Sequence, residues 1–241
     1  MVDAVLFDFG GTLFDYYPSN YSILGSVARQ FGKNIQDTDP ILSIAFQKQE
    51  EYIHTLLLQK KEYSTGWMTD QDWRRGDEIL LETVGIHSTE AKEILAKRFL
   101  ARKMHHYKIF PDAISTLEVL RKNEIKLGLV SNLPKKHVQD RYKMLNHSKL
   151  TEFFSSIVLS GERGVAKPNP AIFKIALEEL HVNSPNNVFH VGDSYIFDAI
   201  GAKNSGITPI LLDPNKGRVC DCTIIASLSE ILNLLLHQEN S

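Results

Sequence analysis

The sequence has no long hydrophobic run and no excess of charge of either sign. None of its 241 residues fall in a stretch long enough to span a bilayer, so a membrane protein is not expected. Its 27 basic and 29 acidic residues nearly cancel, which argues against a general nucleic-acid or anionic-membrane surface. A small molecule or a protein is the expected partner.

Cysteine is equally scarce. Cys220 and Cys222 lie too close together in sequence to make a disulfide framework, and no second Cys/His pair stands at zinc-finger spacing. Both are therefore expected to be reduced thiols. The N-terminal apolar run is short, lies between acidic residues and has no basic region, which indicates a strand and not a signal peptide. Together these observations favour a cytoplasmic protein.

Hydrophobic residues are abundant enough, at 43%, for a substantial core, and they gather in short runs. Five such runs each end at a polar residue or glycine, and helical patterns at 113–122 and 170–180 lie between them. Strands that alternate with helices predict an α/β fold, a Rossmann-like parallel sheet with helices on both faces. The predicted strands are residues 4–7, 125–130, 156–159, 188–191 and 210–212.

Residues 19–106 break this alternation. Apolar residues there recur at helical spacing and no strand pattern appears, which predicts an all-helical insertion. Gly32 and Gly85 are expected to end helices, and Pro40 and Ser88 to begin them. The predicted organisation is a core of residues 1–17 and 107–241 and a helical domain of residues 18–106. Two neighbouring crossings between these parts suggest a hinge.

Four short motifs follow predicted strands, where the ligands of parallel α/β sheets bind. They are the Asp8-Phe9-Gly10-Gly11-Thr12 segment, Ser131-Asn132, Lys167-Pro168, and Gly192-Asp193 with Asp198 five residues further on. Alone, each is explained as a turn or a helix cap, but their joint occurrence at successive strand ends favours a functional site. In this order they make the sequence resemble the haloacid-dehalogenase superfamily, in the branch with a helical cap inserted after the first motif. The resemblance covers nearly the whole chain and implies a hydrolase.

The same residues suit phosphoryl transfer. A carboxylate such as Asp8 can attack phosphorus and form an aspartyl-phosphate. The transferring oxygens need positive charge and hydrogen-bond donors, which Lys167 and Ser131 can supply together with the amides of the turn after Asp8. The catalytic residues are thus expected to be Asp8, Ser131 and Lys167. The expected phosphate-binding residues are Phe9, Gly10, Gly11, Thr12 and Asn132.

The acidic residues suit a magnesium ion. Mg²⁺ prefers oxygen ligands and keeps several waters, so Asp8 and Asp193 make a credible site, to which the resemblance adds the carbonyl of Gly10. Asp198 lies about one helical turn beyond Asp193, where it can hold a metal-bound water or orient Lys167. The resulting prediction is a Mg²⁺-dependent phosphatase that acts on a small phosphorylated metabolite.

Gly10 departs from the family pattern. Phosphatases of this superfamily usually have a second Asp there, which protonates the leaving group and then activates water, and its loss can cost roughly 10²- to 10⁴-fold in rate. Phosphonatases and 2-haloacid dehalogenases also lack this Asp and remain alternatives, as does a catalytically weak phospho-ligand-binding relative. Dehalogenases have no acidic pair suited to a metal in the fourth motif, whereas phosphonatases need a cap lysine. Candidates for that lysine are Lys48, Lys60 and Lys61, while Asp15 is a candidate replacement acid.

Overall fold

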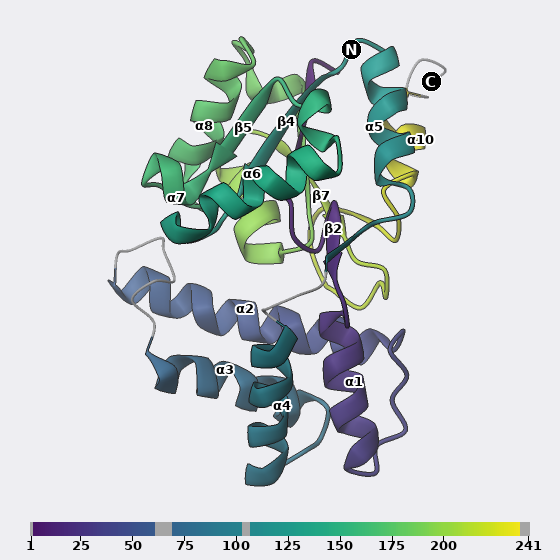
Figure 1. Cartoon of the computed structure of the whole chain (residues 1–241), viewed down its shortest axis with the longest axis vertical. Coiled ribbons are helices and arrows are strands. Elements are labelled where there is room, and N and C mark those ends of the chain that lie inside the picture. Colours follow the sequence, from purple (N-terminus) through teal and green to yellow (C-terminus); the bar gives the residue numbers. More distant parts are fainter. Residues whose placement is uncertain (1, 61–68, 103–106, 237–241) are drawn as a thin grey trace.

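The computed structural model describes residues 2–60, 69–102 and 107–236, and its centre is a six-stranded parallel sheet (Figure 1). The strands follow the order β5-β4-β1-β6-β7-β8, and every neighbouring pair is parallel. The predicted Rossmann-like α/β fold is confirmed, and β8 extends it beyond the five expected strands. The strands are β1 (Ala4–Phe7), β4 (Lys126–Ser131), β5 (Ser156–Leu159), β6 (Val188–Gly192), β7 (Thr208–Leu212) and β8 (Thr223–Ile225).

Helices cover both faces of this sheet. Successive side chains of β1 point to opposite faces of the sheet. Val5 and Phe7 belong to the hydrophobic cluster on one face, and Ala4 and Leu6 to the cluster on the other. All four are fully buried. The covering helices are α5 (Ala113–Lys122), α6 (Val138–His147) and α10 (Glu230–Leu236) on the first face, and α8 (Pro170–Glu179) and α9 (Gly201–Asn204) on the second, with α7 (Ser160–Arg163) after β5.

β1 lies at the point where the strand order reverses. It pairs with β4 on one side and β6 on the other, so Phe7 stands opposite both Leu129 and Val191. Such switch points are where parallel α/β sheets bind ligands, beyond the carboxyl ends of the strands. Asp8 is the first residue past the end of β1 and therefore lies at this position.

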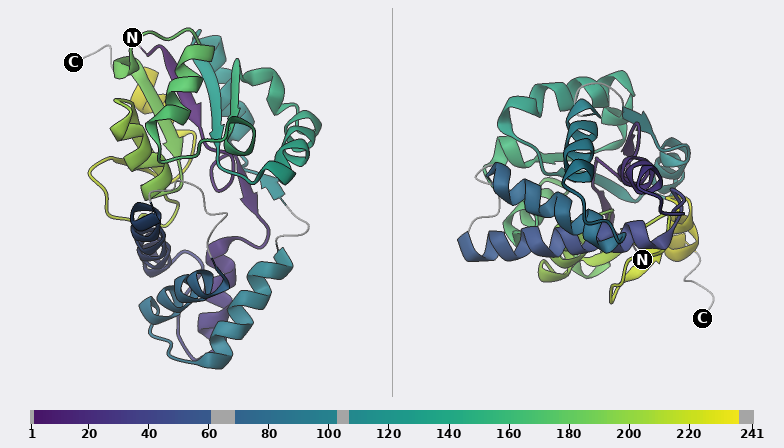
Figure 2. Two further views of the ribbon diagram at one scale, coloured as in Figure 1. Left: turned by 90° about the vertical axis from the view of Figure 1, so that its left-hand side faces the viewer. Right: turned by 90° about the horizontal axis from the view of Figure 1, so that it is seen from below.

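A helical insert, described at residues 20–60 and 69–102, faces the carboxyl ends of the strands (Figures 1 and 2). Most of its buried apolar residues form a hydrophobic cluster separate from those of the sheet. The chain enters and leaves it through β2 (Phe14–Tyr16) and β3 (Tyr107–Ile109), which pair antiparallel and were not predicted as strands. The helices of the insert are α1 (Asn20–Gln30), α2 (Pro40–Lys60), α3 (Asp70–Thr83) and α4 (Thr89–Arg102).

The predicted helix boundaries of the insert are confirmed. Gly32 and Gly85 both have a backbone φ of +76°, and each follows the last turn of a helix, α1 and α3 respectively. Pro40 is the first residue of α2, and the hydroxyl of Ser88 accepts a hydrogen bond from the N–H of Ala91 at the start of α4.

Two further expectations concern cysteine and the membrane. Cys220 and Cys222 are joined in a disulfide, so the expectation of reduced thiols was wrong. Their Cα atoms are 5.2 Å apart, within the usual range for this bond, and one intervening residue suffices for that spacing. Reduced thiols therefore no longer support the expectation of a cytoplasmic protein. Among the described residues, no helix has both the length and the apolar character required to cross a bilayer.

Candidate active site

Asp8 and Lys167 form a buried ion pair at the carboxyl end of β1. Lys167 Nζ lies 2.6 Å from Asp8 Oδ1, and the two side chains are 2% and 10% exposed. The N–H of Asp8 donates to the carbonyl of Val191 at 2.9 Å, which holds the residue against β6. Lys167 Nζ also lies 2.6 Å from Asp198 Oδ1, so one buried cation joins two carboxylates.

Asp193, which follows β6, brings a third carboxylate to the same place. One oxygen from each of Asp8, Asp193 and Asp198 lies within 4.8 Å of the others. Gly11 makes this approach possible, because a Cβ on it would stand only 2.2 Å from Asp193 Oδ2. Its backbone φ is +84°, a conformation that other residues adopt at a cost. Glycine at position 11 is therefore required by the aspartate that packs against it.

Asp198 lies in the π-helical turn η5 (Tyr195–Ile200) and accepts from three donors. Its Oδ1 contacts Lys167 Nζ at 2.6 Å and His190 Nε2 at 2.8 Å, and its Oδ2 accepts from the N–H of Ser194 at 3.0 Å. His190 is fully buried on β6 and was not among the predicted site residues. The one feature of the sequence that could have indicated it is a histidine within an apolar strand that is followed by an aspartate. These contacts suit a carboxylate that orients Lys167.

Ser131 and Asn132 lie at the end of the neighbouring strand β4. Ser131 is the last residue of the strand and is 2% exposed. The side-chain amide of Asn132 is bonded to the backbone of Lys167, since its Nδ2 donates to Lys167 O and its Oδ1 accepts from Lys167 N, both at 2.9 Å. Asn132, expected at the phosphate, therefore fixes the segment that carries the lysine.

The turn after Asp8 has a backbone amide that is already hydrogen-bonded within the protein. The N–H of Gly11 donates to the carbonyl of Phe14 at 2.7 Å. The Thr12 hydroxyl is buried without a hydrogen-bond partner within the described part of the chain. Of the amides expected to bind phosphate, that of Gly11 thus already has an acceptor.

The pKa values of the three carboxylates are shifted in different directions. Burial raises the pKa of Asp8 despite the nearby Lys167, and the charge of Asp198 adds to this effect. Burial, then the charges of Asp8 and Asp198, raise the pKa of Asp193 well above its ordinary value. Burial also acts to raise the pKa of Asp198, but Lys167 and His190 hold it below its ordinary value. The poorly compensated negative charge therefore lies on Asp8 and Asp193.

Helix α2 reaches this site through Glu50. Glu50 Oε2 accepts from the Ser194 hydroxyl at 3.0 Å, and Glu50 Oε1 lies 2.9 Å from Nη1 of Arg218, which is 6% exposed. Although burial acts to lower the pKa of Arg218, the charges of Glu50, Tyr21 and Asp193 raise it. Neither Glu50 nor Arg218 was predicted, because two residues so far apart in sequence produce no local pattern.

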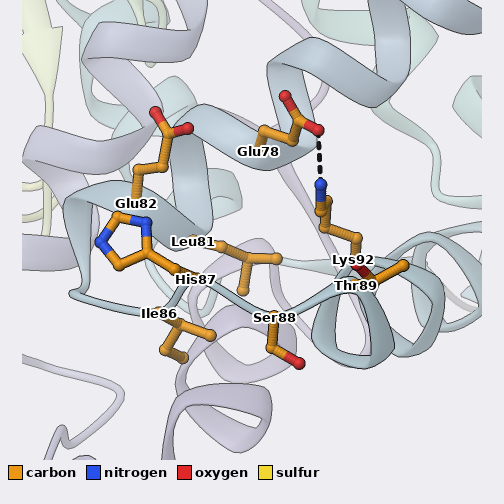
Figure 3. Close-up of a pocket in the computed structure, with 8 residues that line it drawn as sticks. All are labelled: Glu78, Leu81, Glu82, Ile86, His87, Ser88, Thr89 and Lys92. Carbon is orange, nitrogen blue, oxygen red and sulfur yellow. Dashed lines mark hydrogen bonds and ion pairs between the residues drawn. The ribbon is translucent and has the colours of Figure 1, made fainter.

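A hollow of about 260 Å³ lies elsewhere, between α3 and α4 (Figure 3). Glu78 and Lys92 form an ion pair at 2.6 Å across its wall, and His87 and Ser88 also line it. All of its lining residues belong to the helical insert. The carboxylate cluster at the strand ends, and not this hollow, contains the candidate reactive groups.

The fold and the cluster together define a parallel α/β protein with an acidic reactive site at the switch point of its sheet. Residues 2–206 match the family model of the haloacid dehalogenase-like hydrolases. The chain belongs to this family and is a hydrolase.

Both phosphatases and dehalogenases are similar to this chain. A glyceraldehyde 3-phosphate phosphatase of Methanopyrus kandleri is 31% identical over 220 residues, 90% of this chain and 86% of that protein. The crystal structure of a HAD phosphatase from Thermococcus onnurineus is 25% identical, with a TM-score of 0.57 over 97% of both chains. That of a 2-haloacid dehalogenase from Pseudomonas syringae is also 25% identical, with a TM-score of 0.54 over 98% of this chain and 99% of the other. The residues of the site must therefore decide between the two chemistries.

Proposed function

We propose that the protein is a Mg²⁺-dependent phosphatase that acts on a small phosphorylated metabolite through an aspartyl-phosphate on Asp8. The observation that carries this proposal is the meeting of Asp8 and Asp193, which follow the adjacent strands β1 and β6, with Lys167, which lies between α7 and α8 and forms an ion pair with Asp8. A phosphatase relative that is 31% identical over most of the chain supports a phosphate ester as substrate.

In the proposed reaction Asp8 attacks the phosphorus, and water later hydrolyses the aspartyl-phosphate. Lys167 opposes the negative charge of the transferring oxygens, and the Ser131 hydroxyl donates to them. The N–H groups of Gly10 and Thr12 are further candidate donors. The remaining polar residues hold Lys167 in place, Asp198 through its side chain and Asn132 through its backbone.

The donor set fits Mg²⁺. Carboxylate oxygens of Asp8 and Asp193 lie within 4.8 Å of each other and carry poorly compensated charge, and Mg²⁺ prefers such oxygen ligands. We assign the ion to these two carboxylates and the Gly10 carbonyl. Asp198 is left out because both of its oxygens already accept from protein donors. The ion, when bound, supplies positive charge that offsets the charge of the phosphate.

We further propose that residues 18–106 are a cap over a core formed by residues 1–17 and 107–241. The helices of the insert have their own hydrophobic cluster, and α2 contacts the strand ends through Glu50. In this position a cap excludes water from the site and contacts the part of the substrate beyond its phosphate.

The rival chemistries require other features. A dehalogenase has no use for a carboxylate at Asp193, which here lies against the nucleophile. A phosphonatase needs a lysine that reaches the site from the cap, but Lys48 is exposed. The side chain of Lys60 and the whole of Lys61 lie outside the described residues. Gly10 favours a catalytically weak phospho-ligand binder.

A substrate screen tests the proposed function. Purified protein is assayed against sugar phosphates, glyceraldehyde 3-phosphate, nucleotides, phosphonates and 2-haloacids, with Mg²⁺ and with EDTA. We expect phosphate release from at least one phosphomonoester, only in the presence of Mg²⁺ and not by Asp8→Asn. Turnover of 2-haloacids without metal identifies a dehalogenase instead, and binding of a phosphate ester without turnover identifies the weak relative.

A further inference from the structure

The space beside Gly10 is occupied by a tyrosine. A Cβ built on Gly10 would lie 3.2 Å from Tyr16 Oη and 3.7 Å from its Cε2 and Cζ. Gly10 does not have the positive φ found at Gly11, so its backbone does not require glycine. A side chain at this position would press on the phenol of Tyr16, whose hydroxyl lies where a side chain at residue 10 would extend.

The strand pair β2–β3 fixes this phenol. Tyr16 stands opposite Tyr107 in the antiparallel register, and their ring centroids are 4.9 Å apart. Side chains alternate along a strand, so Tyr16 shares a face with Phe14, which stacks on Phe9 at 4.4 Å, whereas Asp15 is directed to the other face. Tyr16, and not Asp15, is therefore directed toward the nucleophile turn.

A buried cation lies beside the same phenol. The guanidinium of Arg141 stands 3.5 Å from the centroid of the Phe9 ring. Burial lowers the pKa of Arg141, while Tyr16, Asp8 and Tyr107 are close enough to raise it. Its Nη1 is buried without a hydrogen-bond partner, and within the described segments it has no carboxylate ion pair. A positive charge so placed favours negative charge that develops on a neighbouring oxygen.

We propose that Tyr16 is the proton donor that compensates for the missing acid at Gly10; this inference rests on the proposed phosphatase function. As Asp8 Oδ bonds to phosphorus, the bond from phosphorus to the leaving oxygen breaks, and the Tyr16 proton passes to that oxygen. The phenolate, beside Arg141, then takes a proton from the water whose oxygen attacks the aspartyl-phosphate. Asp8 leaves as carboxylate and inorganic phosphate is released, with Tyr16 neutral again.

The acidity of the Tyr16 phenol indicates which substrates would benefit from it. A phenol is a weaker acid than a carboxyl group but far stronger than an alcohol, so it can protonate a departing alkoxide. Such help matters for alkyl phosphates and hardly at all for 4-nitrophenyl phosphate, whose leaving group departs as a stable anion. The residue therefore fits a phosphatase whose substrates are alkyl phosphates, such as phosphorylated sugars and alcohols.

The test compares Tyr16→Phe with wild type on glycerol phosphate and 4-nitrophenyl phosphate, both with Mg²⁺. We expect kcat/KM for glycerol phosphate to fall roughly 10²- to 10⁴-fold and that for the aryl ester to change less than about threefold. Tyr107→Phe, which removes the neighbouring hydroxyl, is the matched control and should leave both rates unchanged. Gly10→Asp should help only in the Tyr16→Phe background, where the hydroxyl no longer occupies the space.

Each outcome has a defined meaning. Equal losses on both esters show a structural or binding role and overturn the inference, as does an unchanged rate on glycerol phosphate. If wild type hydrolyses the aryl ester but Tyr16→Phe shows no selective loss, the phosphatase function stands and only the role of Tyr16 fails. If wild type hydrolyses neither ester nor any other phosphomonoester, the proposed function fails, and the role of Tyr16 fails with it.

Discussion

Asp193→Asn should make the metal-free protein more stable while it removes Mg²⁺ binding. Carboxylate oxygens of Asp8 and Asp193 lie no more than 4.8 Å apart, and at an effective dielectric constant of about 20 two such charges repel by about 3 kcal/mol. Arg218 offsets part of this repulsion. We expect a net gain of about 2 kcal/mol, or a rise in Tm of roughly 4–8 °C for a chain of this size.

The pH dependence of this gain has a defined sign. The pKa of Asp193 is raised in the folded state above its ordinary value of 3.8, so folding favours the protonated form. Its contribution to stability is fully present below that value and is lost as pH rises through the folded-state pKa. Metal-free wild type should therefore fall further behind Asp193→Asn as the pH is raised from acid to neutral.

Calorimetry with and without Mg²⁺ measures both effects. Excess Mg²⁺ should raise the Tm of wild type, because Mg²⁺ at a hundred times its Kd adds about 2.7 kcal/mol to the free energy of unfolding. The Tm of Asp193→Asn should not change. Asp213→Asn is the matched control, because Asp213 is fully buried and accepts from Ser43 and Arg218, so this variant should lose stability. A metal-free Asp193→Asn no more stable than wild type would refute the charge argument, and equal Mg²⁺ stabilisation of both would remove Asp193 from the metal site.

Three further changes test other parts of the site. Asp8→Asn should abolish turnover of 4-nitrophenyl phosphate, and EDTA should do the same to wild type until Mg²⁺ is restored; residual turnover in either case contradicts the mechanism. Gly11→Ala should displace Asp193 and weaken Mg²⁺ binding, as titration calorimetry would show, because its Cβ would stand 2.2 Å from that carboxylate. Glu50→Gln removes the carboxylate that is ion-paired with the buried Arg218 and should cost about 3 kcal/mol, measured as a lower Tm, whereas Glu51→Gln, on the exposed neighbour, should cost little.

The strands of the core were predictable because burial on both faces leaves a strong local signal. Residues 4–7 and 156–159 were predicted with the bounds that the structure shows, and the strand expected at 125–130 is shifted by one residue. Each is an apolar run with a polar stop, as parallel strands between two helical layers require. The strands β2, β3 and β8 have only three residues each, too few for a periodic pattern.

The meeting of the motifs was predictable for a topological reason. Parallel strands end at one edge of a sheet, so polar residues that follow successive strands are brought together whatever separates them in sequence. Asp8 and Asp193 illustrate this, because β1 and β6 are direct neighbours. The partners Glu50, Arg218 and Arg141 come from helices and a loop whose sequences carry no sign of what they face.

Gly10 shows why an absent side chain is ambiguous in sequence. A glycine in place of an acid indicates a lost function when only the chain is considered, since nothing in the sequence tells what fills the space. In the structure Tyr16 occupies this space, and its hydroxyl would be 3.2 Å from a Cβ at residue 10. A side chain at residue 10 and the Tyr16 hydroxyl compete for this space, so a glycine at the first position suits a tyrosine at the second. A relative with an acid at the first position should accordingly have a smaller or differently directed residue at the second.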